Sequence, residues 1–290
     1  MHADRFLPHA ALQGLYEALA ERGYAVIAPR VKDGAIFYEE SRHPDSLPWG
    51  IRLEQDAGAS RAVQDTHTQC FAWANGPQAL KPLTFAPRET LWRIKRTAAG
   101  FAVEAIEHAA RPLAVFGARA CDLAALSIQD RHFLGGPYPD PGYAARREDM
   151  LLIAVNCTHP ASTCFCASTG DGPAAEAGFD LALTELEGGF VARAGSARGE
   201  ELLAALTLEN ATPEQAEAAA ASVRHAAESQ TRAIPGTQLR DALMARLDHP
   251  RWREVAERCL ACGNCTLVCP TCFCHAEVEL PELDGSGSLH

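Results

Sequence analysis

Residues 112–134 read PLAVFGARACDLAALSIQDRHFL, an apolar run followed by a stretch with helical spacing. The continuous run PLAVFGA is typical of a parallel strand that is buried on both faces. Leu123 and Leu126 recur at a helical interval, and the Asp122 carboxylate is placed to cap this helix by accepting from N–H groups of its first turn. A second apolar run, MLLIAVNC, occupies 150–157. Strand, helix and strand over about 45 residues predict a βαβ unit with a right-handed crossover.

Each of these two strands ends before a predicted loop with a cysteine, Cys121 after the first and Cys157 after the second. Sites in open α/β sheets gather outside the carboxyl ends of the strands, so we expect the two thiols to converge. The turn-rich segment 158–178 adds Cys164 and Cys166. Four thiolates are the number that a [4Fe–4S] cluster binds, which makes this group a candidate second metal site. The alternatives are buried structural cysteines, or redox-active thiols at Cys164 and Cys166 that handle sulfur.

Further elements surround the βαβ unit along the chain. Helical spacing predicts a helix over residues 9–21. Two β-rich runs flank Asp33-Gly34, which supplies the positive φ of a tight hairpin turn. Antiparallel hairpins are therefore expected at 24–40, 90–106 and 179–195.

Composition divides the chain into three parts. Residues 1–195 hold the predicted strands and indicate an α/β (α+β) domain with hairpins, a βαβ unit and cysteine-bearing loops. Residues 196–258 are rich in Ala, Glu and Leu and contain no cysteine, so three or four helices are expected to form a connector. Residues 259–290 begin with a dense cysteine cluster and end in PELDGSGSLH, which indicates a frayed polar tail.

The overall composition excludes several classes of protein. The 290 residues include 37 acidic and 26 basic side chains, for a net charge of −11. Binding to nucleic acid or to an anionic membrane requires a basic face, so neither partner is expected. No apolar run of about 18 residues occurs, so no membrane span is predicted. The opening MHADRFLPHA lacks the apolar core of a secretory signal, and a cytoplasmic location is expected.

The chain contains 11 cysteines, and their distribution is uneven. None lies in 1–69 or 167–258, whereas six lie within the sixteen residues 259–274. Reducing conditions in the cytosol disfavour disulfides, so this crowding indicates metal or redox chemistry.

Residues 259–270 read CLACGNCTLVCP, which is the spacing C-x2-C-x2-C-x3-C-P. Three thiolates two residues apart can surround three iron corners of a cubane, and the small residues Ala261 and Gly263 permit close approach of the backbone. The fourth cysteine of this spacing points away and, in two-cluster ferredoxins, ligates the other cluster. We therefore predict a [4Fe–4S] segment of ferredoxin type with the ligands Cys259, Cys262, Cys265 and Cys269.

Other interpretations of the motif are weaker or incomplete. A zinc ribbon would show two C-x2-C pairs about 12–20 residues apart, and three cysteines this close share one tetrahedral zinc poorly. No second C-x2-C-x2-C follows Cys269. Either a single cluster is completed by Cys272, by Cys274 or by a distant ligand, or the chain is cut short of a second half-ferredoxin. We favour the second interpretation.

Several other residues near these motifs are candidates for site or packing roles. Arg119 is placed to donate to cluster sulfides or to anchor an anion, with an ordinary surface ion pair as the alternative. His159 and His275 neighbour cysteines but are expected to lie outside the ligand sphere. Packing roles are expected for three residues, namely Cys70 in a strand, Trp49 and Trp73. No G-x-G-x-x-G or Walker loop supports a nucleotide cofactor.

Several stretches in combination resemble a known family. They are LPWGIR (47–52), KPLTFAPRETLW (81–92), RACDLAAL (119–126), FLGGPYPDP (133–141), VNCTHPASTCFCAS (155–168) and RCLACGNCTLVCPTCFC (258–274). Together they resemble the β subunit of cytoplasmic hydrogenase/sulfur reductases (sulfhydrogenases), a group related to one of the subunits of anaerobic sulfite reductase. The resemblance extends over nearly the whole chain from about residue 24.

The resemblance implies an electron-transfer subunit with [4Fe–4S] clusters in a hetero-oligomer. Such a subunit relays electrons between a hydrogenase or sulfite/sulfur reductase catalytic subunit and a flavin/NAD(P) subunit. Residue by residue, Cys259, Cys262 and Cys265 match first-cluster ligands, and Cys269 matches a ligand of a second cluster. Family members continue with a second C-x2-C-x2-C-x3-C-P motif, which this sequence lacks.

Two functions from different classes follow. The first is an iron–sulfur electron-transfer subunit in which no residue makes or breaks substrate bonds, because the clusters change oxidation state while the protein tunes them. The second is a sulfur- or polysulfide-handling reductase subunit that uses the thiols of Cys164 and Cys166.

Overall fold

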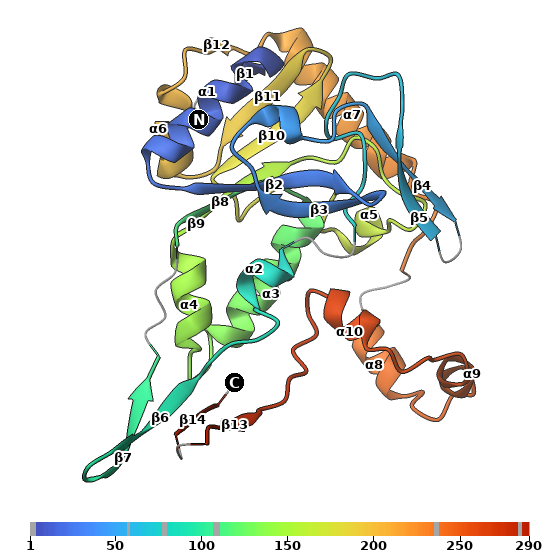
Figure 1. Cartoon of the computed structure of the whole chain (residues 1–290). Coiled ribbons are helices and arrows are strands. Elements are labelled where there is room, and N and C mark those ends of the chain that lie inside the picture. Colours follow the sequence, from blue (N-terminus) through green and yellow to red (C-terminus); the bar gives the residue numbers. More distant parts are fainter. Residues whose placement is uncertain are drawn as a thin grey trace.

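The computed structural model describes residues 4–56, 59–76, 80–106, 111–234, 238–283 and 286–289. Across these residues, an eight-stranded mixed sheet with the strand order β12-β1-β11-β10-β9-β8-β2-β3 forms the upper body in Figure 1. The central neighbours β2, β8, β9 and β10 run parallel, and the other pairs are antiparallel. The strands are β1 (Arg5–Pro8), β2 (Ala25–Lys32), β3 (Ala35–Glu40), β8 (Leu113–Ala118), β9 (Met150–Val155), β10 (Leu181–Leu186), β11 (Gly189–Ala194) and β12 (Glu209–Asn210).

The predicted βαβ unit is present. Parallel strands β8 and β9 are joined through α3 (Ala120–Phe133) and α4 (Pro141–Glu148). Two details of the prediction are wrong. Cys121 lies in the first turn of α3 rather than in a loop, because the helix begins two residues after the strand ends. Asp122 is the third residue of α3, and its Oδ2 atom accepts from the backbone N–H of Arg119 at 2.8 Å. Arg119 is the residue before the helix, so Asp122 does not accept from an N–H group of the first turn as predicted.

Apolar side chains of the central strands alternate between two cores. On β8, Ala114 and Phe116 face the core that contains α1 (Leu12–Glu21) and α6 (Ala197–Ala204). Val115 and Ala118 face the opposite core, which contains α3. Both faces are thus covered, as a continuous apolar run predicts.

The three predicted hairpins are present. The first pairs β2 with β3 through Asp33 (φ 52°) and Gly34 (φ 75°), where the predicted positive φ occurs. The others pair β6 (Trp92–Thr97) with β7 (Gly100–Ala105), and β10 with β11. A further hairpin pairs β4 (Ile51–Asp56) with β5 (Ala59–Gln64). Short helices are η1 (His9–Ala11), η2 (Pro44–Ser46), α2 (Lys81–Thr84) and α5 (Cys166–Thr169).

The expected helices between residues 196 and 258 are α6, α7 (Pro213–Glu228), α8 (Leu239–Met244) and α9 (Arg251–Glu257). They differ in their burial. Leu202 of α6 is fully buried, and Ala219 and Ala226 of α7 are also buried, so these two helices pack on the body of the sheet. Helices α8 and α9 contain no buried residue.

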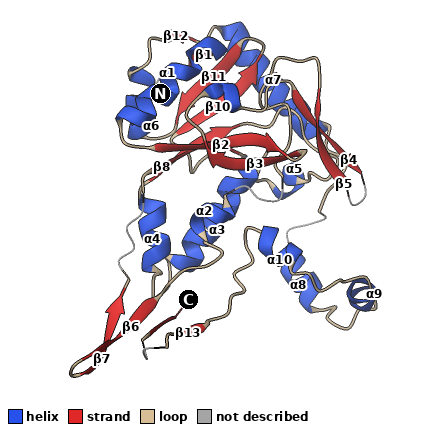
Figure 2. Cartoon of the chain, in the orientation of Figure 1, coloured by secondary structure: helices blue, strands red, loops and turns tan. Residues whose placement is uncertain are grey.

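The cysteine-rich segment contains α10 (Asn264–Val268), β13 (Glu279–Pro281) and β14 (Gly287–Leu289). Figures 1 and 2 show α8, α9 and α10 apart from the eight-stranded sheet. The predicted frayed tail is wrong for 287–289, because β14 pairs antiparallel with β6.

The chain as described is a mixed α/β structure. None of its described helices has the length and apolar character needed to cross a bilayer.

Candidate metal centre

Four of the predicted ligands lie beyond the carboxyl ends of β8 and β9. Cys121 is in the first turn of α3, directly after β8, and Cys157 follows β9. Cys164 and Cys166 lie in the next segment, where Cys166 is the first residue of α5. We call these four residues the four-thiol site.

The thiols of this site influence one another. Burial raises the pKa of Cys157, and Cys166 and Cys164 raise it further. Cys121 is exposed by its surface area, but the protein around its thiol still displaces enough water to raise the pKa. The negative charges of Asp122, Cys157 and Cys166 raise this pKa further. Burial also raises the pKa of Cys166, again with a contribution from Cys164. The charge on each thiol therefore affects the pKa of at least one other thiol in the site. Cys157 and Cys166 each interact in this way with all three of the others.

Hydrogen-bond donors reach two of the sulfur atoms. Ala161 N donates to Cys164 Sγ at 3.3 Å, and Gln230 Nε2 donates to Cys166 Sγ at 3.2 Å. Gly172 packs so closely that a Cβ atom there would lie 3.0 Å from Cys166 Sγ. Sequence reasoning missed Gln230 and Gly172, since Gln230 is 64 residues from Cys166 in the chain and no pattern connects them.

Arg119, two residues before Cys121 in the chain, is buried with 0% of its surface exposed. Its Nη1 atom donates to Val155 O and Asn156 O, each at 3.3 Å. Its Nη2 atom donates to Phe71 O at 3.1 Å and to Trp73 O at 2.9 Å. The guanidinium carbon is 5.2 Å from the centre of the Phe71 ring and 4.7 Å from that of Trp73. The alternative of a surface ion pair is therefore wrong.

The C-terminal cysteine motif (Cys259, Cys262, Cys265 and Cys269) lies in a separate, more open segment. Its first three cysteines are exposed, and Cys269 is half-buried. Ala261 (φ 51°) and Gly263 (φ 73°) both adopt left-handed conformations on either side of Cys262. A residue other than glycine seldom adopts this conformation. Successive N–H groups in such turns form concave sites that bind anions and iron–sulfur clusters.

The side chains of Cys269 and Cys272 interact within this segment. Partial burial acts to raise the pKa of Cys269, but hydrogen bonds with Thr271 and Cys272 lower it overall. The same interaction with Cys269 raises the pKa of Cys272. A lowered thiol pKa favours the thiolate, which is the form that binds metal.

The segment is attached to the rest of the chain by specific contacts. Lys81 Nζ donates to Thr266 O at 2.7 Å, and Gln129 Nε2 donates to Pro270 O at 2.6 Å. The Phe273 ring stacks on His132, with ring centres 4.7 Å apart. These contacts join the motif to α2 and α3, and α3 also carries Cys121.

Within the described ranges, no three His, Cys, Asp or Glu side chains are arranged to hold a single metal ion. A mononuclear zinc site needs four ligands within about 2.3 Å of one point. A cubane spreads its four ligands over separate iron atoms, so its thiolates need not meet at one point.

The remaining candidates have structural contacts. Cys70 is fully buried, as expected, but it lies in a bend and not in a strand. Its N–H donates to Glu185 Oε1 at 2.7 Å, and Phe71 N donates to Glu185 Oε2 at 2.7 Å. Trp73 is buried and donates to Cys70 O, and partly buried Trp49 packs against the same core. Both tryptophans therefore have the packing role that the sequence predicts.

The two histidines make local contacts. The His159 Nδ1 atom lies 2.9 Å from Thr158 Oγ1, and burial lowers the pKa of the ring. The His275 Nδ1 atom lies 2.9 Å from Phe273 O.

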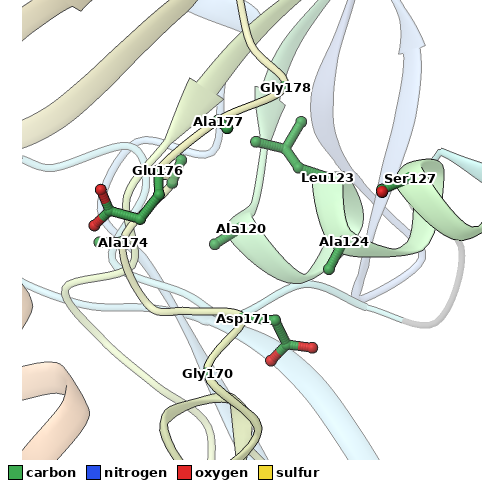
Figure 3. A pocket seen from close by; sticks show the side chains of 11 residues that line it. Ala120, Leu123, Ala124, Ser127, Gly170, Asp171, Ala174, Glu176, Ala177 and Gly178 are labelled. Atoms are coloured by element: carbon green, nitrogen blue, oxygen red, sulfur yellow. The ribbon is translucent and has the colours of Figure 1, made fainter.

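A shallow cavity of about 250 Å³ lies beside the first turns of α3 (Figure 3). Small side chains line it from α3 and from the segment 170–178, together with the carboxylates of Asp171 and Glu176. None of the eight predicted ligands contributes to its wall, although Ala120 adjoins Cys121. The cavity therefore adds no ligand to the four-thiol site.

Comparisons with known proteins give one informative similarity. No family model and no solved structure matches the chain. Over 163 residues it is 34% identical to sulfhydrogenase 2 subunit beta of Pyrococcus furiosus. The aligned stretch covers 56% of this chain and 48% of that protein, so the chain spans about half the length of this curated relative. Over those 163 residues, the similarity confirms the resemblance to a sulfhydrogenase β subunit that the motifs indicate.

Proposed function

We propose that this chain is an iron–sulfur electron-transfer subunit of an oxidoreductase complex. The observation that carries the proposal is the C-terminal cysteine motif, whose C-x2-C-x2-C-x3-C-P spacing coincides with left-handed backbone at Ala261 and Gly263. Cys259, Cys262 and Cys265 are the ligands proposed for one [4Fe–4S] cluster, and Cys269 is proposed to ligate a second.

The four-thiol site is proposed as a further [4Fe–4S] site. Three features of the chain fit such a group. The four thiols affect one another's pKa values, Gly172 lets the backbone approach Cys166 Sγ more closely than a residue with a Cβ would allow, and the buried Arg119 Nε atom has no partner among the described residues. When bound, a [4Fe–4S] cluster supplies one-electron oxidation and reduction.

The chain's own residues would bind and tune these groups. The thiols lose their protons on metal binding, so the raised pKa of Cys157 and Cys166 makes loading of the site depend on pH. N–H donors from Ala161 and Gln230 orient two of the sulfur atoms and stabilise negative charge on them.

The proposed assembly follows from the relative's name and from the motifs. That relative is named as a subunit of a sulfhydrogenase. We propose that this chain belongs to a cytoplasmic hetero-oligomer, in which it relays electrons between a hydrogenase or sulfite/sulfur reductase subunit and a flavin/NAD(P) subunit. Its proposed parts are the α/β domain (1–195), the connector (196–258) and a half-ferredoxin segment (259–290).

The alternative function assigns sulfur chemistry to Cys164 and Cys166. A nucleophilic thiol and a metal-ligating thiol both act as the thiolate, but only a bound metal ion supplies the positive charge that deprotonates a thiol of raised pKa, and burial raises the pKa of Cys166. This observation favours a ligand role over a nucleophilic one at Cys166.

The two functions are separated by a pair of variants of the full chain, reconstituted anaerobically with iron and sulfide. Cys164→Ser/Cys166→Ser should lose the iron of the four-thiol site and keep that of the C-terminal motif. Cys259→Ser/Cys265→Ser should lose the iron of the C-terminal motif and keep that of the four-thiol site. Iron content that does not change in Cys164→Ser/Cys166→Ser, together with a loss of polysulfide reduction, would instead establish the sulfur-handling function.

A further inference from the structure

Arg119 carries a positive charge that the described protein leaves without a paired carboxylate. Its four side-chain hydrogen bonds all end on neutral backbone carbonyl oxygens, and its Nε atom is buried with no partner among the described residues. Carbonyl oxygens satisfy the N–H groups but leave the net charge unchanged. Burying an unpaired charge costs several kcal/mol, so such a site is expected to have a negative partner.

The nearest acidic group does not form an ion pair with the guanidinium. Asp122 Oδ2 accepts from the Arg119 backbone N–H and from Asn75, and no carboxylate of the described residues lies in ion-pair contact with the Arg119 side chain.

The four-thiol site lies on the same ends of β8 and β9. The Nη1 atom of Arg119 bonds the carbonyl groups of Val155 and Asn156, the two residues that lead directly into Cys157. Arg119 itself stands two residues before Cys121, at the start of α3. The guanidinium is therefore close enough to stabilise negative charge on these two sulfur atoms.

A purely structural role for Arg119 would be to clamp the segment 71–73 onto the strand ends. Its hydrogen bonds to Phe71 O and Trp73 O do hold that segment. The two rings that stack on the guanidinium also keep water away from it, which reduces dielectric screening and extends the reach of the charge. A clamp explains the four hydrogen bonds but not the burial of an unpaired charge beside four cysteines.

We propose that Arg119 is the buried counter-charge of the four-thiol site, and that it raises the reduction potential of a cluster held there. A four-thiolate cluster is anionic in both oxidation states and gains a further negative charge on reduction, so a fixed nearby cation stabilises the reduced form more. The inference rests on the proposed binding of a cluster by Cys121, Cys157, Cys164 and Cys166.

The test uses the full chain with Cys259, Cys262 and Cys265 changed to Ser, so that only the four-thiol site binds iron. After anaerobic reconstitution, iron and acid-labile sulfide are counted per chain, and the midpoint potential is measured by a redox titration followed by electron paramagnetic resonance. Arg119→Met removes the charge. Arg193→Met is the matched control, because Arg193 also lies over an aromatic ring, Phe179, and donates to a backbone carbonyl.

Arg119→Met should lower the ratio of reduced to oxidised cluster at a fixed potential at least tenfold, a shift of about 59 mV for one electron. Arg119→Lys, which keeps the charge but not the planar fork, should restore most of this shift. Arg193→Met should leave the potential unchanged. Equal potentials in Arg119→Met and Arg193→Met would overturn the inference while leaving the iron site in place.

A second variant covers the case in which Arg119→Met does not fold. Asp122→Asn removes the carboxylate of the residue next to Cys121, and it should raise the potential. No change in this variant would show that the site does not sense these charges, and would overturn the inference. Absence of iron and sulfide in the background protein would overturn both the inference and the proposed four-thiol site.

Discussion

Asp122 combines a structural contact with an unusual ionisation. It caps α3 through Arg119 N and lies beside Cys121. Burial is the largest cause that raises its pKa from 3.8 to about 6. In the metal-free chain the folded state therefore keeps this proton up to about pH 6, whereas the unfolded state releases it near pH 4.

Between pH 4 and pH 6 the folded chain binds more protons at Asp122 than the unfolded chain does. The contribution of Asp122 to the free energy of unfolding therefore falls as the pH rises from 4 to 6, by roughly 3 kcal/mol at most. Asp122→Asn should abolish this part of the pH dependence, as measured by urea unfolding of the metal-free chain at pH 4, 5, 6 and 7. Asp140→Asn, which removes the capping carboxylate of α4, should keep it. If the free energy of unfolding of Asp122→Asn depended on pH as that of the wild type does, the raised pKa of Asp122 would be refuted.

Cys70 provides a residue-scale control for the ligand assignments. It is fully buried, and its thiol donates to Glu185 Oε1 at 3.3 Å. Cys70→Ala should lower the free energy of unfolding by about 1–3 kcal/mol, because it creates a cavity and removes one partner of a buried carboxylate. The iron content after reconstitution should equal that of the wild type. Loss of iron in this variant would mean that Cys70 is a ligand and that our assignment of the 11 cysteines is wrong.

Residue-scale prediction from the sequence succeeded where the residue type alone is informative. Burial of Cys70 and Trp73 follows from their apolar character. The burial of Arg119 could not be predicted, because it depends on a segment 46 residues earlier in the chain that folds over the guanidinium. The hydrogen bonds to Glu185 depend in the same way on contacts between residues 115 positions apart.

At the scale of elements, the loop around Cys262 depends on left-handed backbone. Gly263 has φ +73° with open space around the position of a Cβ, so Gly263→Ala adds strain without a clash. We expect about 1 kcal/mol of strain and reduced iron incorporation at the C-terminal motif.

The matched control is Gly188→Ala in the turn between β10 and β11. Gly188 has φ +80° and equally open surroundings, so its substitution should cost similar strain but leave the iron content unchanged. Iron and sulfide analysis of both variants checks the prediction. Equal iron content in the two variants would show that the left-handed conformation at Gly263 is not needed for binding.

Strands and turns that are specified by a local sequence pattern were predicted correctly. The apolar runs at β8 and β9, and the Asp33-Gly34 turn, specify their strands and hairpin through nearest neighbours in the sequence. The strand order was beyond prediction, because β1 and β12 join the sheet through pairings across almost the whole domain. The packing of α7 on the sheet is likewise a long-range property.

At the scale of the whole molecule, few contacts join the C-terminal motif to the α/β body among the described residues. The Lys81–Thr266 hydrogen bond is one of these attachments. Lys81→Met should remove it at a cost of about 1 kcal/mol, which corresponds to roughly fivefold faster local opening. Hydrogen exchange should therefore accelerate in residues 264–270 and stay slow in β8 and β9.

Lys95→Met is the control for this prediction, because it removes an exposed lysine that pairs with Glu104 on the β6–β7 hairpin. It should leave exchange in residues 264–270 unchanged. Equal exchange in that segment for wild type and Lys81→Met would show that other contacts position the motif.

The central claim is that the cysteines hold iron–sulfur clusters. Elemental and acid-labile sulfide analysis of the anaerobically reconstituted full chain, before and after Cys259, Cys262 and Cys265 are changed to Ser, tests it most directly. We predict equimolar iron and sulfide with visible absorption that dithionite bleaches, a loss of part of both elements in the triple variant, and a remainder held by the four-thiol site. Zinc without sulfide in the wild-type chain would contradict the account.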